Sequence, residues 1–257
     1  TNSSIQNNLA QVGGGIYKTS GSLSLTLNNS TISNNTAFNG GGIEYDGGSL
    51  VLNNSTINNN SAGSTGGGIY IYSTSLTLNN STISANSAGY LGGGIYIHTA
   101  NLTSNNGTIS NNSAVDSGGG IYIQTGTGSS VSLKNSILGD NFSKSGQDCF
   151  GSLASGGNNF ISNTSGCSVT AANGDKFNVN PSLGTFLPAQ GYHPLLPGSP
   201  AINAGNSGNC LPTDQRGVTR VGTCDIGAYE YTTPGTVASL SVVSGSEQRT
   251  PPNFAFV

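Results

Sequence analysis

The ionisable residues that could carry out acid–base chemistry gather in one stretch near the C-terminal end of the chain. Asp214, Arg216 and Arg220 precede Asp225 and Glu230. Carboxylates beside arginines can form an acid–base site, as enzymes acting on polysaccharides require. The same residue types can instead form a buried ion-pair lock that closes the end of a fold. We favour the lock and keep catalysis at this position as the alternative.

The rest of the chain holds few groups that could do chemistry. Residues 1 to 130 carry only these ionisable acids and bases: Lys18, Glu44, Asp46, His98 and Asp116. Glu44 and Asp46 share one strand face, but the matching positions of the neighbouring repeats hold tyrosine or threonine. We therefore expect no catalytic residues and no cofactor, and the protein is interpreted as a non-enzyme.

Four cysteines form two local pairs, Cys149 with Cys167 and Cys210 with Cys224. An even number of cysteines at short separations in a polar chain predicts disulfides and hence export to an oxidising compartment. Neither pair has the CxxC spacing of many zinc sites, and the two histidines, His98 and His193, are isolated. No metal site is expected.

A sequence repeat determines where these ionisable residues and cysteines lie in the fold. Gly-Gly-Gly-Ile begins at Gly13, Gly40, Gly66, Gly92 and Gly118, at intervals of 27, 26, 26 and 26 residues. Each repeat then has short apolar segments with a period of 2 and the motif Asn-Asn-Ser-Thr-Ile, which predicts strands, while abundant Gly, Asn, Ser and Thr oppose helix. The sequence predicts an all-β fold, a single-stranded, right-handed parallel β-helix with three strands per coil of about 26 residues.

Aligning the repeats predicts three inward columns. The first contains Ile16, Ile43, Ile69, Ile95 and Ile121. The second contains Leu27, Leu52, Leu78 and Leu133 and is interrupted by Ser104. The third contains Ile5, Ile32, Ile57, Ile83, Ile109 and Ile137. Small residues, Ala37, Ala62, Ala88 and Ala114, are expected to mark a tight corner.

Other columns are expected to face outward or to occupy turns. Paired asparagines, such as Asn53-Asn54, are expected to hydrogen-bond from coil to coil. One column contains Tyr17, Glu44, Tyr70, Tyr96 and Tyr122, with Tyr72 and His98 one step outward. Its tyrosines could form a carbohydrate-binding strip, although stabilisation of the solenoid by stacking is the interpretation we favour.

Many asparagines lie in the Asn-x-Ser/Thr context that glycosylation requires. Most are explained by turns and ladders, but some could carry glycans in an organism able to add them. The candidate positions are Asn28, Asn34, Asn53, Asn59, Asn79, Asn101, Asn106, Asn111, Asn141 and Asn163.

The chain divides into three parts. Residues 1–143 are predicted to form regular coils, 144–231 irregular coils and a disulfide-stapled cap, and 232–257 a linker with an extended tail. Thr1 to Ala10 aligns with Asn28 to Ala37, so the sequence begins within a coil. The tail ends in Phe254, Phe256 and Val257 and resembles the opening strands of an invasin-type immunoglobulin-like domain. Donation of this tail to a neighbouring subunit is one hypothesis; a processed remnant or a linker are the others.

Three segments of the cap resemble a known family. Ser199-Pro200-Ala201-Ile202-Asn203-Ala204-Gly205, Asp214-Gln215-Arg216-Gly217 and Asp225-Ile226-Gly227-Ala228-Tyr229-Glu230 are similar to the C-terminal signature of the choice-of-anchor Q family of bacterial surface proteins. The repeats are similar to those of secreted β-helix adhesins and polymorphic outer-membrane proteins. This resemblance implies an exported or surface-attached β-helix and implies no enzyme chemistry.

The amino-acid composition limits the classes of partner that this protein can bind. Only 7% of residues are charged and the net charge is −3, so no basic surface is available for nucleic acid. No apolar run is long enough to span a membrane. We expect an extracellular or cell-surface structural protein whose subunits stack end to end into a filament. The alternative is a monomeric adhesin stalk that binds a glycan or a host or neighbouring surface, and a polysaccharide-active enzyme is the third hypothesis.

Overall fold

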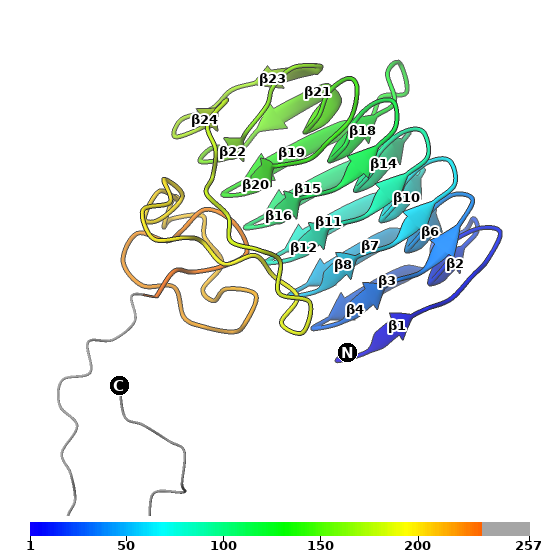
Figure 1. Ribbon diagram of the computed structural model, residues 1–257, viewed down its shortest axis with the longest axis horizontal. Helices are drawn as coiled ribbons and strands as arrows, with labels where there is room; N and C mark the ends of the chain where they lie inside the picture. Colours follow the sequence, from blue (N-terminus) through cyan, green and yellow to red (C-terminus); the bar gives the residue numbers. More distant parts are fainter. Residues whose placement is uncertain (233–257) are drawn as a thin grey trace, which may run out of the picture.

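The computed structural model describes residues 1–232, and they form an elongated solenoid of parallel strands with a cap on one side (Figure 1). No helix occurs among these residues. The expected all-β parallel solenoid is confirmed. The tail residues Phe254, Phe256 and Val257, on which the strand-donation hypothesis rests, lie outside the described residues.

The strands lie in three parallel sheets. The first, called here the Thr-Ile-Ser sheet, has eight strands in the order β1 (Ser4–Gln6), β4 (Thr31–Ser33), β8 (Thr56–Asn58), β12 (Thr82–Ser84), β16 (Thr108–Ser110), β20 (Ile137–Gly139), β22 (Phe160–Ile161) and β24 (Lys176–Phe177). Each coil contributes one strand, and every pair is parallel.

A twelve-stranded sheet forms two further sides of the solenoid. One side contains β2 (Ile16–Lys18), β6 (Ile43–Asp46), β10 (Ile69–Tyr72), β14 (Ile95–His98) and β18 (Ile121–Ile123). The other contains β3 (Ser24–Asn28), β7 (Ser49–Asn53), β11 (Ser75–Asn79), β15 (Asn101–Asn105) and β19 (Ser130–Lys134). The long strand β21 (Cys149–Ser155) pairs with both sides and joins them, and β23 (Cys167–Thr170) pairs with β21.

The predicted alanine corner contains a fourth strand in each of four coils. These two-residue strands are β5 (Thr36–Ala37), β9 (Ser61–Ala62), β13 (Ser87–Ala88) and β17 (Ser113–Ala114), and they form a sheet of their own. Each alanine is buried, whereas the serine or threonine before it faces outward. The small side chain allows the backbone to pass close to the core while the corner still pairs with its neighbours.

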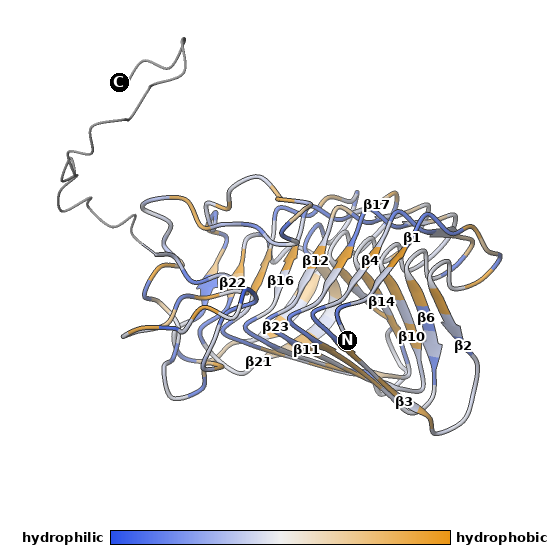
Figure 2. Cartoon of the chain, turned by 90° about the horizontal axis from the view of Figure 1, so that it is seen from below, coloured by the Kyte–Doolittle hydropathy of each residue, from blue (hydrophilic) through white to orange (hydrophobic). Residues whose placement is uncertain are grey.

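Inward-facing isoleucine and leucine side chains fill the solenoid and form one continuous core cluster. In Figure 2 the hydrophobic segments follow the strands, and the turns between them are polar. The first two predicted columns are confirmed by the register of the strands: Ile69 pairs with Ile95, and Leu78 pairs with Ser104. Apart from Ser104, residues of the same type therefore stack along the axis in these two columns, which keeps the core uniform from coil to coil.

The third predicted column is wrong at its last member. Ile109 pairs with Leu138, and Ile137 pairs with Thr108. Leu138 therefore continues the inward column, while Ile137 faces outward and packs beneath the cap with Phe160, Leu195 and Ile226. The motif Asn-Ser-Ile misplaces this residue because Ile137 stands where the other coils have threonine, and Leu138 stands where they have isoleucine. A shift of one residue reverses the face on which a strand side chain lies.

Ser104 replaces leucine in the second column because the same coil has lost a serine nearby. In the other coils a serine hydroxyl accepts a backbone N–H of the preceding coil; these residues are Ser30, Ser55, Ser81 and Ser136. In the fifth coil Gly107 stands at the equivalent position. A Cβ atom on Gly107 would lie 2.2 Å from Oγ of Ser104. The hydroxyl of Ser104 therefore occupies the space that Gly107 leaves and contacts Oγ of Ser136 at 3.1 Å.

This exchange predicts strong coupling between the two positions. Gly107→Ser alone is expected to destabilise the protein by about 1–3 kcal/mol, because the new side chain overlaps Ser104. Adding Ser104→Leu restores the pattern of the other coils and should return stability to within about 0.5 kcal/mol of wild type. Urea unfolding of the four proteins of the cycle measures the coupling, and additive effects of the two substitutions would contradict the explanation.

A second amide ladder, which the sequence analysis did not identify, runs through the buried interior. Asn35, Asn60, Asn86 and Asn112 lie one above another and are at most 1% exposed. In each, Nδ2 donates to Oδ1 of the next asparagine at 2.9–3.0 Å and to a backbone carbonyl of the preceding coil. Their spacing in the sequence follows the repeat, so this signal could have identified them.

Backbone packing and this ladder together explain the third glycine of each Gly-Gly-Gly triplet. A Cβ on Gly68 or Gly94 would lie 2.7 or 2.6 Å from the backbone carbonyl of the matching glycine in the next coil. It would also lie 3.0 or 3.1 Å from the carboxamide of Asn86 or Asn112. In the last regular coil Asp148 takes the place of the third glycine. Among residues 1–232, no asparagine carboxamide of a further coil hydrogen-bonds to Asp148, so a larger side chain can be accommodated.

Asp148 ends the ladder. Its Oδ1 accepts the backbone N–H and Nδ2 of Asn141, and Oδ2 accepts Ser162 and the backbone N–H of Asn163. All the carboxamides donate in one direction, so the ladder finishes on an acceptor that needs no further partner. Burial raises the pKa of Asp148, although hydrogen bonds from Asn141 and Ser162 act in the opposite direction.

Candidate functional site

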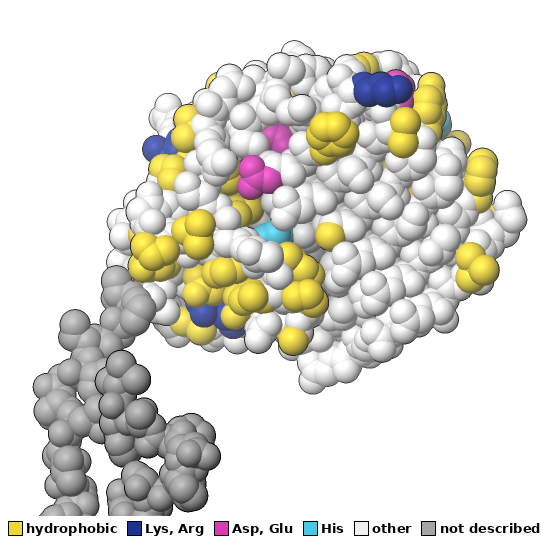
Figure 3. Space-filling view, in the orientation of Figure 1, with side chains coloured by type: hydrophobic (Ala, Val, Ile, Leu, Met, Phe, Trp, Pro, Cys, Tyr) yellow, Lys and Arg dark blue, Asp and Glu magenta, His cyan; other side chains and the backbone are white. Residues whose placement is uncertain are grey.

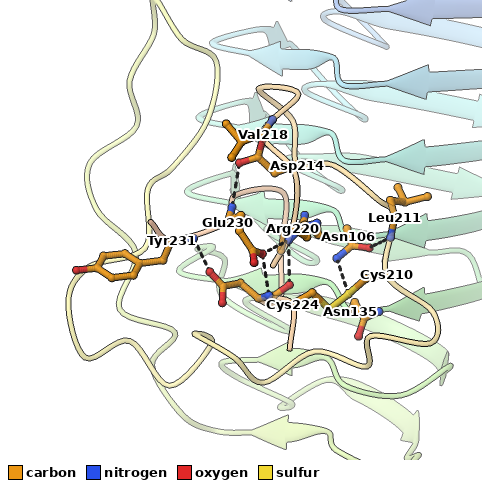
Figure 4. Close-up of polar contacts among 12 residues, drawn as sticks. Asn106, Asn135, Cys210, Leu211, Asp214, Val218, Arg220, Cys224, Glu230 and Tyr231 are labelled. Carbon is orange, nitrogen blue, oxygen red and sulfur yellow. Dashed lines mark hydrogen bonds and ion pairs between the residues drawn. A yellow bond between two sulfur atoms is a disulfide. The ribbon is translucent and has the colours of Figure 1, made fainter. Parts of the chain in front are cut away.

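The charged residues of the cap form two ion pairs within a network that joins the cap to the solenoid. Figure 4 shows the part of this network around Arg220 and Glu230. Arg216 Nη2 lies 2.7 Å from Asp214 Oδ2, and Arg220 Nη1 lies 2.9 Å from Glu230 Oε2. Arg220 is the hub, because it also donates to the carbonyls of Asp225 and Gly227 and to Oδ1 of Asn80 in the solenoid. Burial lowers the pKa of Arg220, and Glu230 counteracts this effect.

Asp225 does not join an ion pair among the described residues, contrary to the expectation from sequence. Its carboxylate instead accepts the backbone N–H groups of Asn203 and Tyr231. Burial raises its pKa, and these hydrogen bonds counteract part of the increase. The reason is topological: the chain folds back on itself at the end of the cap, and Asp225 holds two of its turns together.

The acids of the cap bind neighbouring groups rather than a substrate space. Asp214 accepts the backbone N–H groups of Arg216, Val218 and Glu230 in addition to the guanidinium. Both oxygens of Glu230 accept backbone N–H groups as well. A carboxylate whose lone pairs are all used this way stabilises loop geometry. This arrangement fits an ion-pair network that closes the end of the fold better than it fits an acid–base site.

Two disulfides lie in the C-terminal part of the described chain. Cys149 is bonded to Cys167, and Cys210 to Cys224. Cys149 continues the first inward column, where it pairs with Ile121, so this bond ties the core to β23. The second bond closes a loop of the cap that has no regular secondary structure. Closing loops of this length stabilises a fold by about 3 kcal/mol each in the chain-entropy model.

A column of asparagines binds the cap to the outer side of the solenoid. Asn80, Asn106 and Asn135 hydrogen-bond groups of the cap at Thr213, Leu211 and Asn206. Two lower members of the column, Asn29 and Asn54, share the same left-handed backbone, with φ of 48° and 49°. Their carboxamides make no hydrogen bond with a described residue. The cap therefore covers only the upper part of the column.

Below the cap this column lines a polar cleft of about 350 Å³. Asn29, Asn54 and Thr56 form one side, and Gln190 and Arg216 of the cap form the other. Thr56, Gln215 and the carbonyl of Gly191 are joined by hydrogen bonds of 2.8–2.9 Å at its base. No sequence pattern could locate this cleft, because its two sides come from segments more than 130 residues apart.

The tyrosine column packs face to face along the axis. The ring centroids of Tyr70, Tyr96, Tyr122 and Phe150 are 5.0–5.3 Å apart and the planes are within 8° of parallel. Burial, and then the neighbouring Tyr96, raises the pKa of Tyr70 to about 12. Stacked sugars bind to open aromatic faces, and here the faces between neighbouring rings are covered. This geometry favours the stabilising role over a carbohydrate-binding strip.

Glu44 lies between Tyr17 and Tyr70 in this column and does not form an acid–base pair. One carboxylate oxygen, Oε2, is buried without a hydrogen-bond partner in the described part of the chain. Burial and then the negative charge of Asp46 raise the pKa of Glu44. Asp46 itself accepts the backbone N–H of Ser20, and its carbonyl binds Lys18. Lys18 thereby secures a turn.

An apolar notch of about 370 Å³ lies on the four-stranded sheet of the corner. Small residues of β9, β13 and β17 form its floor, and Val115 and Phe142 form its wall. Both wall residues are exposed, as are Leu9, Phe38 and Tyr90 at neighbouring positions.

The face of the molecule that Figure 3 shows carries few charged side chains, and its hydrophobic side chains gather over the cap.

The candidate glycosylation positions differ in how far their asparagine side chains are exposed to solvent. Asn34, Asn59, Asn101 and Asn111 are exposed, and Asn28, Asn53, Asn79 and Asn163 are half-buried. Asn106 and Asn141 are buried with hydrogen-bonded side chains, so a glycan on either residue is incompatible with the folded protein. These two candidates are wrong because both carboxamides serve in contacts between coils or with the cap.

His193 joins the cap to the solenoid as a neutral side chain. Its Nδ1 donates to the carbonyl of Gly184 at 2.9 Å, so Nε2 accepts from Oγ of Ser84 at 2.8 Å. Burial lowers the pKa of His193, while Asp140 and the bond to Gly184 counteract the shift. Ser84 and Asp140 come from distant coils, so no local sequence pattern links them to this histidine.

Acid is expected to destabilise the protein through His193. As the pH falls below about 6.5 the unfolded chain binds a proton that the folded chain does not, so stability falls by at most about 1.4 kcal/mol per pH unit until the lowered pKa is reached. In His193→Gln this contribution is absent. Urea unfolding between pH 7 and 5 should give a difference between the two proteins that shrinks with acid, and a constant difference would contradict the neutral assignment.

The described residues contain no group of three histidine, cysteine, aspartate or glutamate side chains arranged to hold a metal ion. They also contain no helix of the length and hydropathy that crossing a membrane requires.

Comparisons with known proteins identify one similarity. Residues 106–124 match the Chlamydia polymorphic membrane protein repeat. This segment includes β16, the buried Asn112 and the glycine triplet that begins at Gly118. No curated protein and no solved structure matches the chain. The resemblance to the choice-of-anchor Q family is not confirmed and stays a prediction, whereas one coil of this solenoid is similar to a repeat of surface proteins.

Proposed function

We propose that this protein is a surface-exposed, adhesin-like structural protein that serves as a rigid solenoid outside the cell. The observation that carries the proposal is a continuous stack of coils, one of which matches a polymorphic membrane protein repeat. Two disulfides support a location in an oxidising environment. The described acids of the cap are used in loop contacts, which favours a structural role.

Surface exposure can be tested with an epitope tag inserted after Gly126. This glycine lies in a turn where added atoms meet nothing within 4 Å, so the coils should tolerate the insertion. Intact producing cells are expected to bind an antibody against the tag. The control is the same tag on a cytoplasmic protein, which should be labelled only in permeabilised cells. Labelling of the solenoid only after permeabilisation would exclude surface display.

End-to-end assembly is a second hypothesis. Each coil pairs with its neighbours through parallel strands along one axis, and the same kind of backbone pairing can join one subunit to another. Electron microscopy of native material at near-physiological salt is expected to show fibres with an axial repeat near the length of one solenoid. Dispersed short rods would favour a monomeric stalk.

A further inference from the structure

The uncovered asparagines beneath the cap have the backbone geometry of those that bind it. Asn80, Asn106 and Asn135 have φ of 45°, 50° and 46°, close to those of Asn29 and Asn54. In Asn135 the carboxamide donates to one carbonyl and accepts one N–H, both of Asn206. Asn29 and Asn54 offer the same pair of donor and acceptor, one coil or about 4.8 Å apart. They line the polar cleft instead of holding the cap.

Arg216 also lines this cleft, and its guanidinium is held in an ion pair with Asp214 at 2.7 Å. Its guanidinium lies over the ring of Tyr229, with 3.9 Å to the ring centroid, and 5.5 Å from that of Tyr192. Nε donates to Asp214, and Nη2 donates to the carbonyl of Glu230. Nη1 has no partner among residues 1–232, so its N–H groups remain to bind a ligand. An arginine held in this way is suited to a carboxylate.

The chemistry of the lining indicates the class of ligand. Alanine at position 189 is the only aliphatic residue of the lining, and the other lining residues carry hydroxyl, amide or guanidinium groups. The solenoid side of the cleft is the outer face of the Thr-Ile-Ser sheet, whose backbone groups are already paired between strands. A peptide therefore cannot join it as an added strand. A volume of about 350 Å³ suits a small polar molecule.

We propose that this cleft binds a saccharide that carries a carboxylate. Arg216 binds the carboxylate, and Asn29 and Asn54 each exchange hydrogen bonds with neighbouring hydroxyl groups of the sugar. Thr56 and Gln215 are fixed by their own hydrogen bonds and form a rigid base. This inference specifies a ligand class for the proposed adhesin-like function, and its failure would leave surface display intact, since the two are measured independently.

Isothermal titration calorimetry of the purified full chain with digalacturonate and with sialyllactose tests the proposal. The methyl ester of digalacturonate is the neutral control. At least one acidic sugar is expected to bind, at least tenfold more tightly than its neutral counterpart, and more weakly as salt rises. Binding of neither acidic sugar up to about 10 mM, or equal binding of acid and ester, would overturn the proposal. A synthetic peptide of residues 237–257 that binds instead would also overturn it.

Two substitutions in the same coil test the site in the cleft. Asn54→Gly removes a carboxamide while glycine keeps the left-handed backbone, and it should weaken binding at least tenfold. Asn59→Gly removes an exposed carboxamide that also has a left-handed backbone but does not line the cleft, and it should change affinity less than twofold. Arg216→Gln should abolish the preference for the acid over the ester, with thermal unfolding recorded to confirm folding. Equal losses in Asn54→Gly and Asn59→Gly would contradict a site in the cleft.

Discussion

Asn86→Ala is expected to destabilise the solenoid by about 3–5 kcal/mol, more than most single substitutions in a protein interior. Oδ1 of Asn86 accepts both the backbone N–H and Nδ2 of Asn60, and its Nδ2 donates to the carbonyl of Ile57 and to Asn112. Alanine leaves these buried groups without partners, and each unsatisfied group costs about 1–3 kcal/mol. The free energy of urea unfolding measures the effect.

The outer amide ladder provides the matched control. Asn79 also donates to the asparagine of the coil below, at 2.9 Å, but it is half-buried and within reach of water. Asn79→Ala removes the same chemical group from the same coil and should cost less than about 1 kcal/mol, because water can satisfy the groups that remain. Similar losses for the two variants would show that burial does not decide the contribution of these ladders.

Arg220→Met is expected to release the cap from the solenoid. The side chain of Arg220 is 4% exposed and that of its partner Glu230 is 6% exposed, so the substitution leaves a buried, unpaired carboxylate. Removing one partner of such a pair costs about 3–5 kcal/mol. The bond to Asn80 is lost as well, and it is one of the contacts that hold the cap against the coils.

Hydrogen exchange can locate this change. Faster exchange is expected in residues 195–231, whereas β10, β11 and β12 should keep their protection because their hydrogen bonds are to neighbouring coils. Adding Glu230→Gln should recover part of the lost stability, because the buried charge is then absent. Lys144→Met is the control for loss of a positive charge at an exposed position. Uniform exchange over the whole chain would contradict a cap that opens separately.

Several features of the fold could be predicted from the sequence because they depend on neighbouring residues or on the repeat. A period of 2 in apolar residues specifies strands, and a constant spacing of about 26 residues brings equivalent positions into contact in successive coils. The columns of Ile69 and Leu78 follow from this spacing alone. Two cysteine pairs at short separation likewise indicated the disulfides.

The expectations were wrong, or absent, where the repeat changes. One residue of register decided whether Ile137 or Leu138 faces the core, and motif matching could not detect it. The buried asparagines recur with the repeat, yet this spacing alone does not show which way their side chains point. Only the structure shows that they lie inside and end on Asp148, which belongs to the next glycine motif.

By itself the sequence determined the type of coil, the number of residues per coil and the composition of the core, because these depend on local periodicity and on contacts between equivalent positions. The tertiary structure decided which face of the solenoid the cap covers, and therefore which asparagines bind the cap and which line the cleft. Asn54 and Asn80 have the same backbone and the same neighbours in sequence. Their different surroundings arise from Arg220 and Thr213, residues more than 130 positions away that the fold brings to only one of them.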